Sequence, residues 1–437
     1  MNEALKRLND SILLKGVRIV DPVKGLDEKL DVLIEDGYIK AIGNVGSIKK
    51  DTKRLDLNNK WLCPTLIDMH VHLREPGEEY KETILTGTKA AASGGFGAVC
   101  CMPNTNPVDD NPSVTRFIIE KADKEGFCKV YPIAAITKGQ KGESLTEFGD
   151  LKEAGAIALS DDGVPVSNAN VMRVALEYAL GFDMLIISHA EELELSKEGC
   201  MNEGPVSTML GLKGIPSAAE EVAIYRDVRL CAFTGARLHI AHVSTKESVN
   251  IIREAKRQGT RVTAETAPHY FSLTHEAVIG YNTNAKMNPP LRSQEDVDAI
   301  IDGLKDGTID VIATDHAPHS ELEKDIEFSL AANGIIGLET SIPLSLELVR
   351  KGHLTPLELI SKLSLNPHKI LNLNIPSLAV GELANFVIID PELEFTLSKD
   401  MLHSKSCNSP FLGKTLKGRA IVTVKDSFVS FDMFNLL

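Results

Sequence analysis

Eight short apolar runs alternate with helix-like stretches through the middle of the chain, and this alternation constrains the fold more than any other feature. Most of the runs are continuously apolar, as expected for strands buried on both faces of a parallel sheet. Repeated β–α units of this kind predict an α/β protein with a (β/α)8 barrel of the TIM type. The predicted strands are residues 64–72, 96–102, 129–136, 156–160, 184–189, 237–243, 261–266 and 309–315. The predicted helices include residues 83–92, 113–125, 170–180, 217–233, 246–257 and 296–305.

The two ends of the chain show a different pattern, in which short strand-like segments are separated by Gly and Asp turns. These segments are residues 12–24, 31–44, 55–57, 384–390, 418–424 and 427–431. We therefore expect a small β-sandwich module built from both termini, with one sheet that contains strands from each end. The predicted domains are residues 1–62 and 377–437 for this module and residues 63–376 for the barrel.

The net charge of the chain limits its partners. The 437 residues carry a formal charge of −14, which argues against sequence-independent binding to nucleic acid, because such binding needs a basic surface. A small anionic substrate remains compatible with this charge, since local cations can dominate the field within a cleft.

Cysteine usage and the N-terminal stretch predict the compartment. The seven cysteines are odd in number and form no C-x-x-C motif, which favours reduced thiols over a disulfide framework. Residues 1–16 contain neither a long apolar core nor a cleavage site typical of a signal peptide. No apolar run approaches the ~20 residues of a membrane span. We expect a cytoplasmic protein without a membrane partner.

Polar side chains stand at the ends of five predicted strands. In a (β/α)8 barrel these ends form one rim, where the chemistry takes place. A single histidine there is usually a capped polar residue, and Asp-Asp-Gly at 161–163 also fits an ordinary turn. Imidazoles and carboxylates from five strand ends together instead predict a centre for two divalent metal ions, with zinc favoured. The candidates are His70, His72, Asp161 or Asp162, His189, His242 and Asp315.

Arg74 follows the first histidine pair by two residues, in a turn that contains Pro76 and Gly77. A guanidinium group beside a metal centre is suited to hold an anionic substrate bidentately. The alternative is a surface salt bridge between Arg74 and Glu75 or Glu78.

A series of motifs resembles the type I dihydroorotases, the long bacterial form within the amidohydrolase superfamily. The resemblance spans about residues 20 to 424. The motifs are HLREPG at 72–77, GGFGAVCCMPNTNP at 94–107, SDDG at 160–163, SHAEE at 188–192, AHVST at 241–245, KMNPPLR at 286–292, ATDHAPH at 313–319 and NGIIGLET at 333–340.

This resemblance implies a metal-ligand set for one or two zinc ions, with two favoured. Asp162 would bridge the two ions, at a position where many relatives carry a carbamylated lysine. The chemistry of the two neighbouring aspartates does not itself separate Asp161 from Asp162. The first ion would be held by His70, His72, Asp315 and the bridge, and the second by His189, His242 and the bridge.

The resemblance also implies a reaction. Dihydroorotases reversibly cyclise N-carbamoyl-L-aspartate to L-dihydroorotate plus water, in de novo pyrimidine (UMP) biosynthesis. In ring opening, a hydroxide bridging the metal ions would attack the amide, and Asp315 would be the catalytic proton shuttle. The implied substrate-binding residues are His72, Arg74, Asn104, Asn288, His319, Asn333 and Gly334.

Two other functions are compatible with parts of the pattern. A hydantoinase or allantoinase would not need Arg74, Asn104 and His319, because its substrate lacks the carboxylate that these residues would hold. An inactive scaffold for a carbamoyltransferase would be expected to lose metal ligands, and all six are present. A homo-oligomer, with a dimer favoured, and a complex with aspartate carbamoyltransferase are the predicted assemblies.

The remaining histidines are expected to have structural roles. His239 should be packed and hydrogen-bonded within its strand, and His316 should fix its loop. The other residues assigned to structure are His269, His275, His353, His368 and His403.

Overall fold

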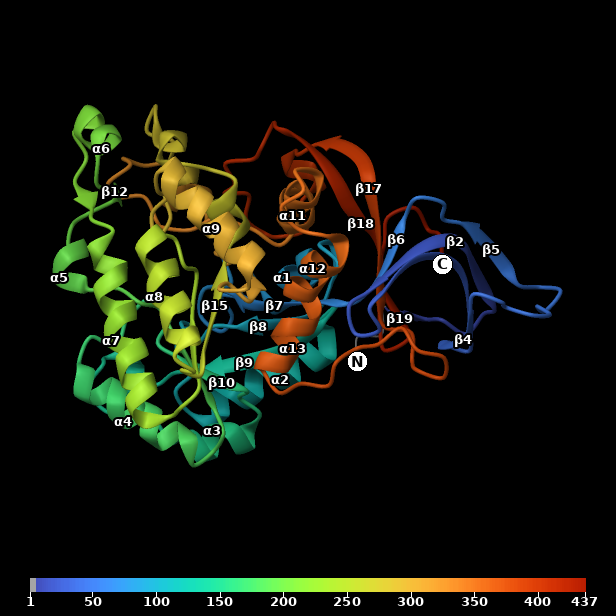
Figure 1. Ribbon diagram of the computed structural model, residues 1–437, viewed down its shortest axis with the longest axis horizontal. Helices are drawn as coiled ribbons and strands as arrows, with labels where there is room; N and C mark the ends of the chain where they lie inside the picture. The colour runs from blue at the N-terminus through green and yellow to red at the C-terminus, as the bar shows by residue number, and fades with distance from the viewer. Residues whose placement is uncertain (1–4) are drawn as a thin grey trace.

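The computed structural model describes residues 5–437 and confirms the predicted barrel (Figure 1). Residues 1–4, which begin the predicted 1–62 segment and the stretch inspected for a signal peptide, lie outside the described residues. Eight parallel strands follow one another around the barrel in sequence order. They are β7 (Leu66–Val71), β8 (Phe96–Cys101), β9 (Lys129–Ala134), β10 (Ala158–Ser160), β11 (Leu185–Ser188), β14 (Leu238–Ile240), β15 (Val262–Thr266) and β16 (Val311–Ile312).

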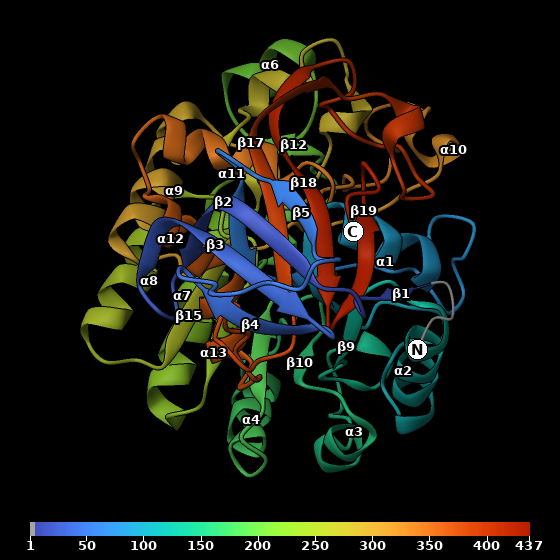
Figure 2. The same ribbon diagram turned by 90° about the vertical axis from the view of Figure 1, so that its right-hand side faces the viewer.

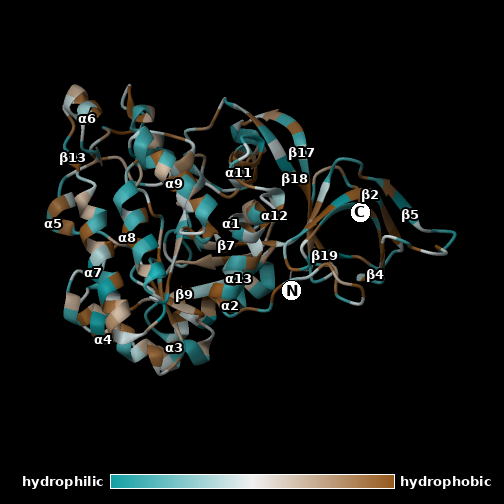
Figure 3. Cartoon of the chain, in the orientation of Figure 1, coloured by the Kyte–Doolittle hydropathy of each residue, from teal (hydrophilic) through white to brown (hydrophobic). Residues whose placement is uncertain are grey.

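A helix follows each barrel strand, and these helices form the outer ring. Their surfaces alternate between hydrophilic and hydrophobic residues (Figure 3), as expected for helices with one face on the sheet and one in water. The ring consists of α1 (Ile84–Ser93), α2 (Pro112–Glu125), α3 (Phe148–Ala154), α4 (Ala169–Leu180), α7 (Ala218–Thr234), α8 (Lys246–Arg257), α9 (Gln294–Asp306) and α11 (Ser341–Arg350).

Local sequence signals set the ends of these helices. Helix α9 begins at Ser293, whose hydroxyl accepts from the Asp296 amide while the Asp296 carboxylate accepts from the Ser293 amide in return. It ends at Gly307, which has a φ of 80°, a left-handed conformation that costs glycine little. Helix α2 begins after Asn111, with Pro112 at its first position.

Shorter elements decorate the ring. An insertion after β11 contains α5 (Leu193–Ser196), β12 (Met201–Asn202), α6 (Pro205–Leu210) and β13 (Gly214–Ile215). Helix α10 (Glu321–Lys324) follows β16, and α12 (Pro356–Ile360) and α13 (Asn366–Ile370) follow α11. Single 3-10 turns occupy Lys138–Gln140, Pro268–Phe271, His275–Val278, Thr283–Ala285 and Lys399–Met401, and Ser361–Leu365 is a π-helical turn.

Strand β16 is shorter than the predicted segment 309–315, because the chain leaves regular strand geometry before Asp315, which has a φ of 48°. Side chains and single bridges therefore close the barrel between β16 and β7. The Thr314 amide donates to Asp68 Oδ1 over 3.1 Å, and the His72 amide donates to the His316 carbonyl over 2.8 Å.

The terminal strands pair into one nine-stranded sheet, which confirms that both ends of the chain share a sheet (Figure 2). The N-terminal and C-terminal parts meet where β6 pairs with β17, for example at Leu62 and Ile388. The domain boundaries at 62/63 and 376/377 stay a prediction. The strands are β1 (Lys6–Arg7), β2 (Ile12–Asp21), β3 (Leu26–Glu35), β4 (Tyr38–Ile42), β5 (Lys53–Asp56), β6 (Trp61–Pro64), β17 (Phe386–Thr396), β18 (Thr415–Lys425) and β19 (Phe428–Asp432).

Alternation along β17 joins this sheet to the barrel. Phe386 and Ile388 pack into the core of the terminal sheet, whereas Val387 and Ile389 pack into the core that the barrel shares with its helices. Successive strand residues point to opposite faces, so one strand serves both cores.

Each of the seven cysteines is a free thiol, and six of them are buried. This agrees with the expectation of reduced thiols. Within residues 5–437, every helix is too short or too polar to cross a bilayer.

Candidate metal centre and active site

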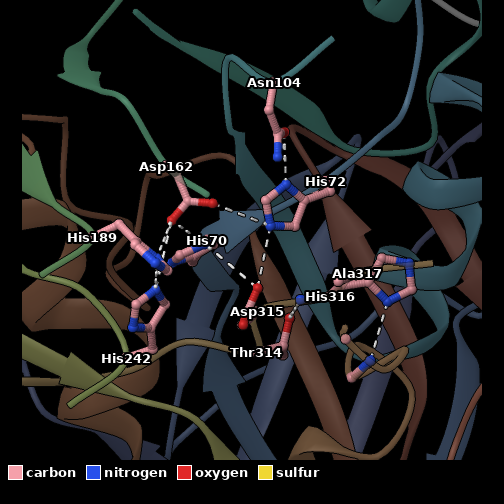
Figure 4. A network of polar contacts seen from close by, with 12 residues as sticks. His70, His72, Asn104, Asp162, His189, His242, Thr314, Asp315, His316 and Ala317 are labelled. Carbon is pink, nitrogen blue, oxygen red and sulfur yellow. Dashed lines mark hydrogen bonds and ion pairs between the residues drawn. The ribbon is translucent and has the colours of Figure 1, made fainter. Parts of the chain in front are cut away.

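Asp162 lies at the centre of a polar cluster at the barrel rim, with four histidines around it (Figure 4). Its Oδ1 atom is 3.3 Å from His70 Nε2 and 3.6 Å from both His189 Nδ1 and His242 Nε2. Its Oδ2 atom is 3.5 Å from His72 Nε2. One carboxylate therefore faces histidines from three different strand ends.

Asp315 completes the cluster from the end of β16. Its Oδ1 atom is 3.2 Å from His72 Nε2 and 3.5 Å from His70 Nε2. The structure thus brings all six predicted metal ligands to one centre. The ligand atoms of His70, His72 and Asp162 lie within 4.8 Å of one another, and so do those of Asp162, His189 and His242.

The neighbouring Asp161 has a different environment. Its Oδ1 atom accepts hydrogen bonds from the main-chain amides of Ile136 and Thr137, over 2.8 and 3.1 Å. Its Oδ2 atom accepts from the Thr137 hydroxyl. Asp161 therefore ties the loop after β10 to the loop after β9, while Asp162 faces the histidines. The structure separates two residues that sequence chemistry left as alternatives.

The cluster fits divalent metal ions. His70 Nε2 and Asp162 Oδ1 are buried polar atoms without a hydrogen-bond partner within residues 5–437, which is costly unless something binds them. Two ligands of one tetrahedral zinc ion, each ~2.0–2.1 Å from it, would stand about 3.3 Å apart. The observed nitrogen–oxygen separations of 3.2 to 3.6 Å around Asp162 and Asp315 match that spacing.

The carboxylates and imidazoles of the cluster shift one another's pKa values. Burial alone would raise the pKa of Asp162 and Asp315, but the surrounding histidines lower both below the usual range. Burial alone would lower the pKa of His189, but the neighbouring carboxylates of Asp162 and Glu191 raise it to about 10. Ionised carboxylates beside protonated imidazoles are sites at which a divalent cation can replace protons.

Glu265 supports the centre from strand β15 and was missed by the sequence analysis. His70 Nδ1 is 2.7 Å from Glu265 Oε1, and His239 Nε2 is 3.2 Å from Glu265 Oε2. Burial would raise the pKa of Glu265, but these two histidines lower it to about 2. A carboxylate behind a metal-binding imidazole fixes the tautomer and orientation of the ring.

Two further contacts orient ligand rings. Glu191 Oε2 lies 3.2 Å from His189 Nε2 and accepts from Asn288 Nδ2 over 3.0 Å. Asn104 Oδ1 lies 2.8 Å from His72 Nδ1. Asn104 and Asn288, both predicted substrate contacts, therefore lie next to the metal-ligand cluster.

Arg74 and His319 form the second part of the site. Arg74 is only 8% exposed, and its Nη1 atom is 3.7 Å from Glu78 Oε2, so the salt bridge that was its alternative role is present but is formed by a buried guanidinium group. Its Nη2 atom is 3.2 Å from His319 Nε2, and its Nε donates to the Pro318 carbonyl over 3.2 Å. His319 Nε2 also contacts the Asn333 carbonyl over 2.7 Å. Arg74, His319 and Asn333 thus lie side by side.

Three site residues have left-handed backbone conformations. Arg74, His242 and Asp315 have φ values of 60°, 35° and 48°. Non-glycine residues rarely adopt this region, which costs about 1–3 kcal/mol each and is typical of functional sites. In β14, Leu238 and Ile240 pack outward, so simple alternation would point His242 away from the barrel interior. The unusual φ of His242 accompanies its turn toward Asp162.

The structural histidines behave largely as predicted. His316 Nδ1 accepts from the Gly337 amide over 3.1 Å, and His239 contacts Thr263 and Glu265 inside the barrel. His269, which was assigned a structural role, lies close to the metal-ligand cluster. It is buried beside the cluster, and burial lowers its pKa to about 4 against the opposing effect of the Asp315 charge.

Comparisons with known proteins identify relatives of this chain. Residues 59–248 match the family model described as dihydro-orotase-like. Dihydroorotase from Trichlorobacter lovleyi is 56% identical over 95% of this chain and 97% of its own length. Dihydroorotase from Geobacter metallireducens is 57% identical over 95% and 98%.

Solved structures with the same fold include enzymes with other names. L-hydantoinase from Arthrobacter aurescens superposes with a TM-score of 0.85 at 22% identity, covering 98% of this chain and 97% of that one. A D-hydantoinase superposes with a TM-score of 0.84 at 23% identity, covering 97% and 96%. At this identity the likeness concerns the fold, and it confirms the barrel with its terminal sheet.

Proposed function

The chain belongs to the dihydroorotase family, and we propose from this premise that it interconverts N-carbamoyl-L-aspartate and L-dihydroorotate. The observation that carries the proposal is the position of Arg74, a buried cation within reach of the charges of Asp162 and Asp315 in the cluster of six His and Asp residues. A cyclic amide with a carboxylate substituent needs both parts, because one end of the molecule reacts while the other is an anion.

The proposed cofactor is zinc, with two ions favoured, and Asp162 would be a ligand of both. His70, His72 and Asp315 would hold one ion, and His189 and His242 the other. The bound ions would supply an activated water and polarise the amide carbonyl. The nitrogen-rich ligand set and the spacing of the ligand atoms support zinc over magnesium or calcium, which prefer oxygen ligands.

Asp315 is the proposed proton shuttle. Its lowered pKa keeps the carboxylate ionised at neutral pH, which is the protonation state that a general base requires. In ring opening it would take a proton from the attacking water and deliver it to the departing ring nitrogen. In ring closure it would take a proton from the ureido nitrogen and deliver it to the leaving hydroxyl group.

Arg74, Asn104 and His319 are the proposed carboxylate contacts. Burial lowers the pKa of His319 to about 3, so its imidazole is neutral and Arg74 provides the positive charge. Asn104 uses its oxygen toward His72, which leaves its amide hydrogens for the substrate. His72 is both a proposed ligand and a substrate neighbour.

Asn288, Asn333 and Gly334 are the proposed contacts to the ring amide. The Asn288 amide already donates to Glu191, which leaves its side-chain oxygen as an acceptor for a ring N–H. Gly334 has a φ of 119°, and an added Cβ would lie 2.6 Å from Ala317 Cβ, so glycine is required for this loop to approach the rim.

The proposal extends to location and assembly. Seven free thiols support a reducing, cytoplasmic environment. A homodimer and a complex with aspartate carbamoyltransferase stay predictions, which size measurement of the purified protein alone and with that enzyme would check.

A panel of cyclic amides tests the proposed function. L-dihydroorotate and 5,6-dihydrouracil share the reacting ring and differ by the carboxylate, so they form a matched pair. We expect kcat/KM for ring opening of dihydroorotate to exceed that for dihydrouracil, hydantoin and allantoin by at least ~100-fold. The reason is that these three substrates have no carboxylate to pair with the buried Arg74. Equal or faster turnover of a substrate without the carboxylate would reject the proposal in favour of a hydantoinase-like activity.

A further inference from the structure

The chain between β17 and β18 crosses the barrel rim and is tied to it at several points. We define residues 403–409 as the rim segment. The His403 amide donates to Glu339 Oε2 over 2.9 Å, and the Lys405 amide donates to Glu82 Oε1 over 3.0 Å. Both glutamates are buried. A C-terminal segment thus becomes part of the wall around the site.

Asn408 is the member of the rim segment that contacts the proposed substrate-binding loops. Its Oδ1 atom accepts from the His319 amide over 3.1 Å. Its Nδ2 group donates to the Ala317 carbonyl over 3.0 Å and to the Gly334 carbonyl over 3.1 Å. The side-chain amide therefore bonds to the 317–319 turn and to the 333–334 loop at once.

The hydrogen-bonding capacity of this amide is matched to its surroundings. Asn408 is 4% exposed, and its oxygen and both of its N–H groups have main-chain partners. Its own carbonyl accepts from the Ile336 amide over 3.0 Å. Removing the side chain would take this partner from the His319 N–H and from the Ala317 and Gly334 carbonyls, of which the Gly334 carbonyl would keep its bond from Lys324.

The two loops are held in close contact at this point. Lys324 Nζ donates to the same Gly334 carbonyl over 3.1 Å and to the Ala332 carbonyl over 2.7 Å. The space beside Gly334 is so narrow that an added Cβ would lie 2.6 Å from Ala317 Cβ, in the turn that carries His319. A small shift of either loop would therefore change the distance between His319 and Asn333, which is 2.7 Å from Nε2 to the carbonyl oxygen.

We infer that Asn408 is a positioning residue for the substrate. It sets the spacing between His319 and the 333–334 loop. His319 is a proposed carboxylate contact, and the 333–334 loop is the proposed ring-amide contact. Asn408 itself belongs to neither loop. This inference rests on the proposed function. The bonds of Asn408 run to the substrate loops and none of them to a metal ligand, so its loss should affect substrate binding more than metal binding or proton transfer.

Steady-state kinetics of Asn408→Ala holoenzyme with L-dihydroorotate test the inference. We expect KM to rise at least about tenfold while kcat stays within about threefold of wild type, because the displaced loops weaken binding and leave the proton shuttle in place. Zinc content should be unchanged. Asn366→Ala is the matched control, since Asn366 Nδ2 donates to the Asp310 carbonyl over 2.8 Å at the opposite end of the barrel. Its KM should equal that of wild type.

Asn408→Ser serves if the alanine variant does not fold, because a hydroxyl keeps one polar atom at this position. Its KM should rise at least about threefold. A KM within twofold of wild type in a folded Asn408 variant, or an equal rise in the Asn366→Ala control, would overturn the inference. Wild-type protein that binds zinc yet does not turn over dihydroorotate would reject the proposed function instead, so the two failures are distinguishable.

Discussion

His70 Nδ1 lies 2.7 Å from Glu265 Oε1, and both side chains are buried inside the barrel. This contact commits one ring nitrogen of His70 to Glu265 and leaves Nε2 facing Asp162, 3.3 Å away. Glu265 also contacts His239 over 3.2 Å, so a single carboxylate anchors two histidines under the proposed metal centre.

Glu265→Gln should weaken metal binding. An amide oxygen accepts less strongly than a carboxylate, and partners of this kind typically change metal affinity or activity by about 10–100-fold. Zinc dissociation constants from competition with a chromogenic chelator measure the effect. Glu339→Gln is the control, because Glu339 is also buried and its Oε1 atom lies 2.9 Å from His403 Nδ1. This contact is not part of the metal-ligand cluster. Equal zinc affinity in wild type and Glu265→Gln would contradict the supporting role.

Asp315→Ala should abolish turnover in both directions. A positioned general acid–base contributes roughly 10²–10⁴-fold, and loss of a proposed ligand adds to that effect. Rates of dihydroorotate hydrolysis and carbamoyl aspartate cyclisation provide the measurement. Asp310→Ala is the control and should keep kcat near wild type. Asp310 precedes the same strand, and its Oδ2 atom accepts from the Ala264 amide over 2.8 Å. Near-wild-type kcat in Asp315→Ala would exclude the shuttle.

Arg74→Ala should mainly weaken substrate binding. The lost charge-assisted hydrogen bonds are worth about 2 kcal/mol, which corresponds to roughly a 30-fold rise in KM. Arg74→Lys should recover only part of this, because an ammonium group cannot make the paired contacts of a guanidinium group. Arg173→Ala is the control, since Arg173 is partly exposed and pairs with Glu177 on α4, away from the site. An unchanged KM in Arg74→Ala would show that another residue anchors the substrate.

Asp109 predicts a specific pH dependence of stability. Burial raises the pKa of Asp109 to about 7, although Thr115 donates to its Oδ1 over 2.6 Å. In the unfolded chain the pKa of an aspartate is about 3.9, so the folded state binds the proton of Asp109 more tightly. The stabilisation is complete below pH ~4 and is lost as pH rises through about 7.

Asp109→Asn should remove this dependence, because an amide does not titrate. The free energy of unfolding of the variant relative to wild type should therefore increase between about pH 5 and 7.5, by ~1 kcal/mol or more. Urea unfolding of both proteins in the same metal-loaded state at several pH values provides the comparison. Parallel stability curves for the two proteins would show that Asp109 is ionised in the folded protein throughout.

Much of the fold and of the cluster was predictable because both depend on local patterns. Apolar runs mark buried strands, and polar residues directly after them, such as His189 and Asp315, must lie on one rim. The choice between Asp161 and Asp162 was not predictable from their chemistry, because it depends on which loop each carboxylate reaches. Strand alternation would also point the His242 side chain away from the barrel interior, and its actual direction depends on a φ of 35°.

The sequence did not predict the residues that position other site residues. Glu265 is separated from His70 by 195 positions, and the one available signal was a charged residue inside a strand predicted to be buried on both faces. Asn408 gave no signal, because its role arises only when a C-terminal segment crosses loops that lie 74 and more positions earlier. Such long-range contacts follow from the tertiary fold, which residue spacing does not encode.

The most direct test of the account is dihydroorotate hydrolysis followed during removal and return of zinc. The enzyme should lose activity when a chelator removes the metal and regain it in proportion to added zinc, up to two ions per chain. Asp162→Ala should bind less zinc and regain no activity, because the proposed bridge is absent. Full activity in metal-free enzyme, or no activity on dihydroorotate with both sites loaded, would contradict the account.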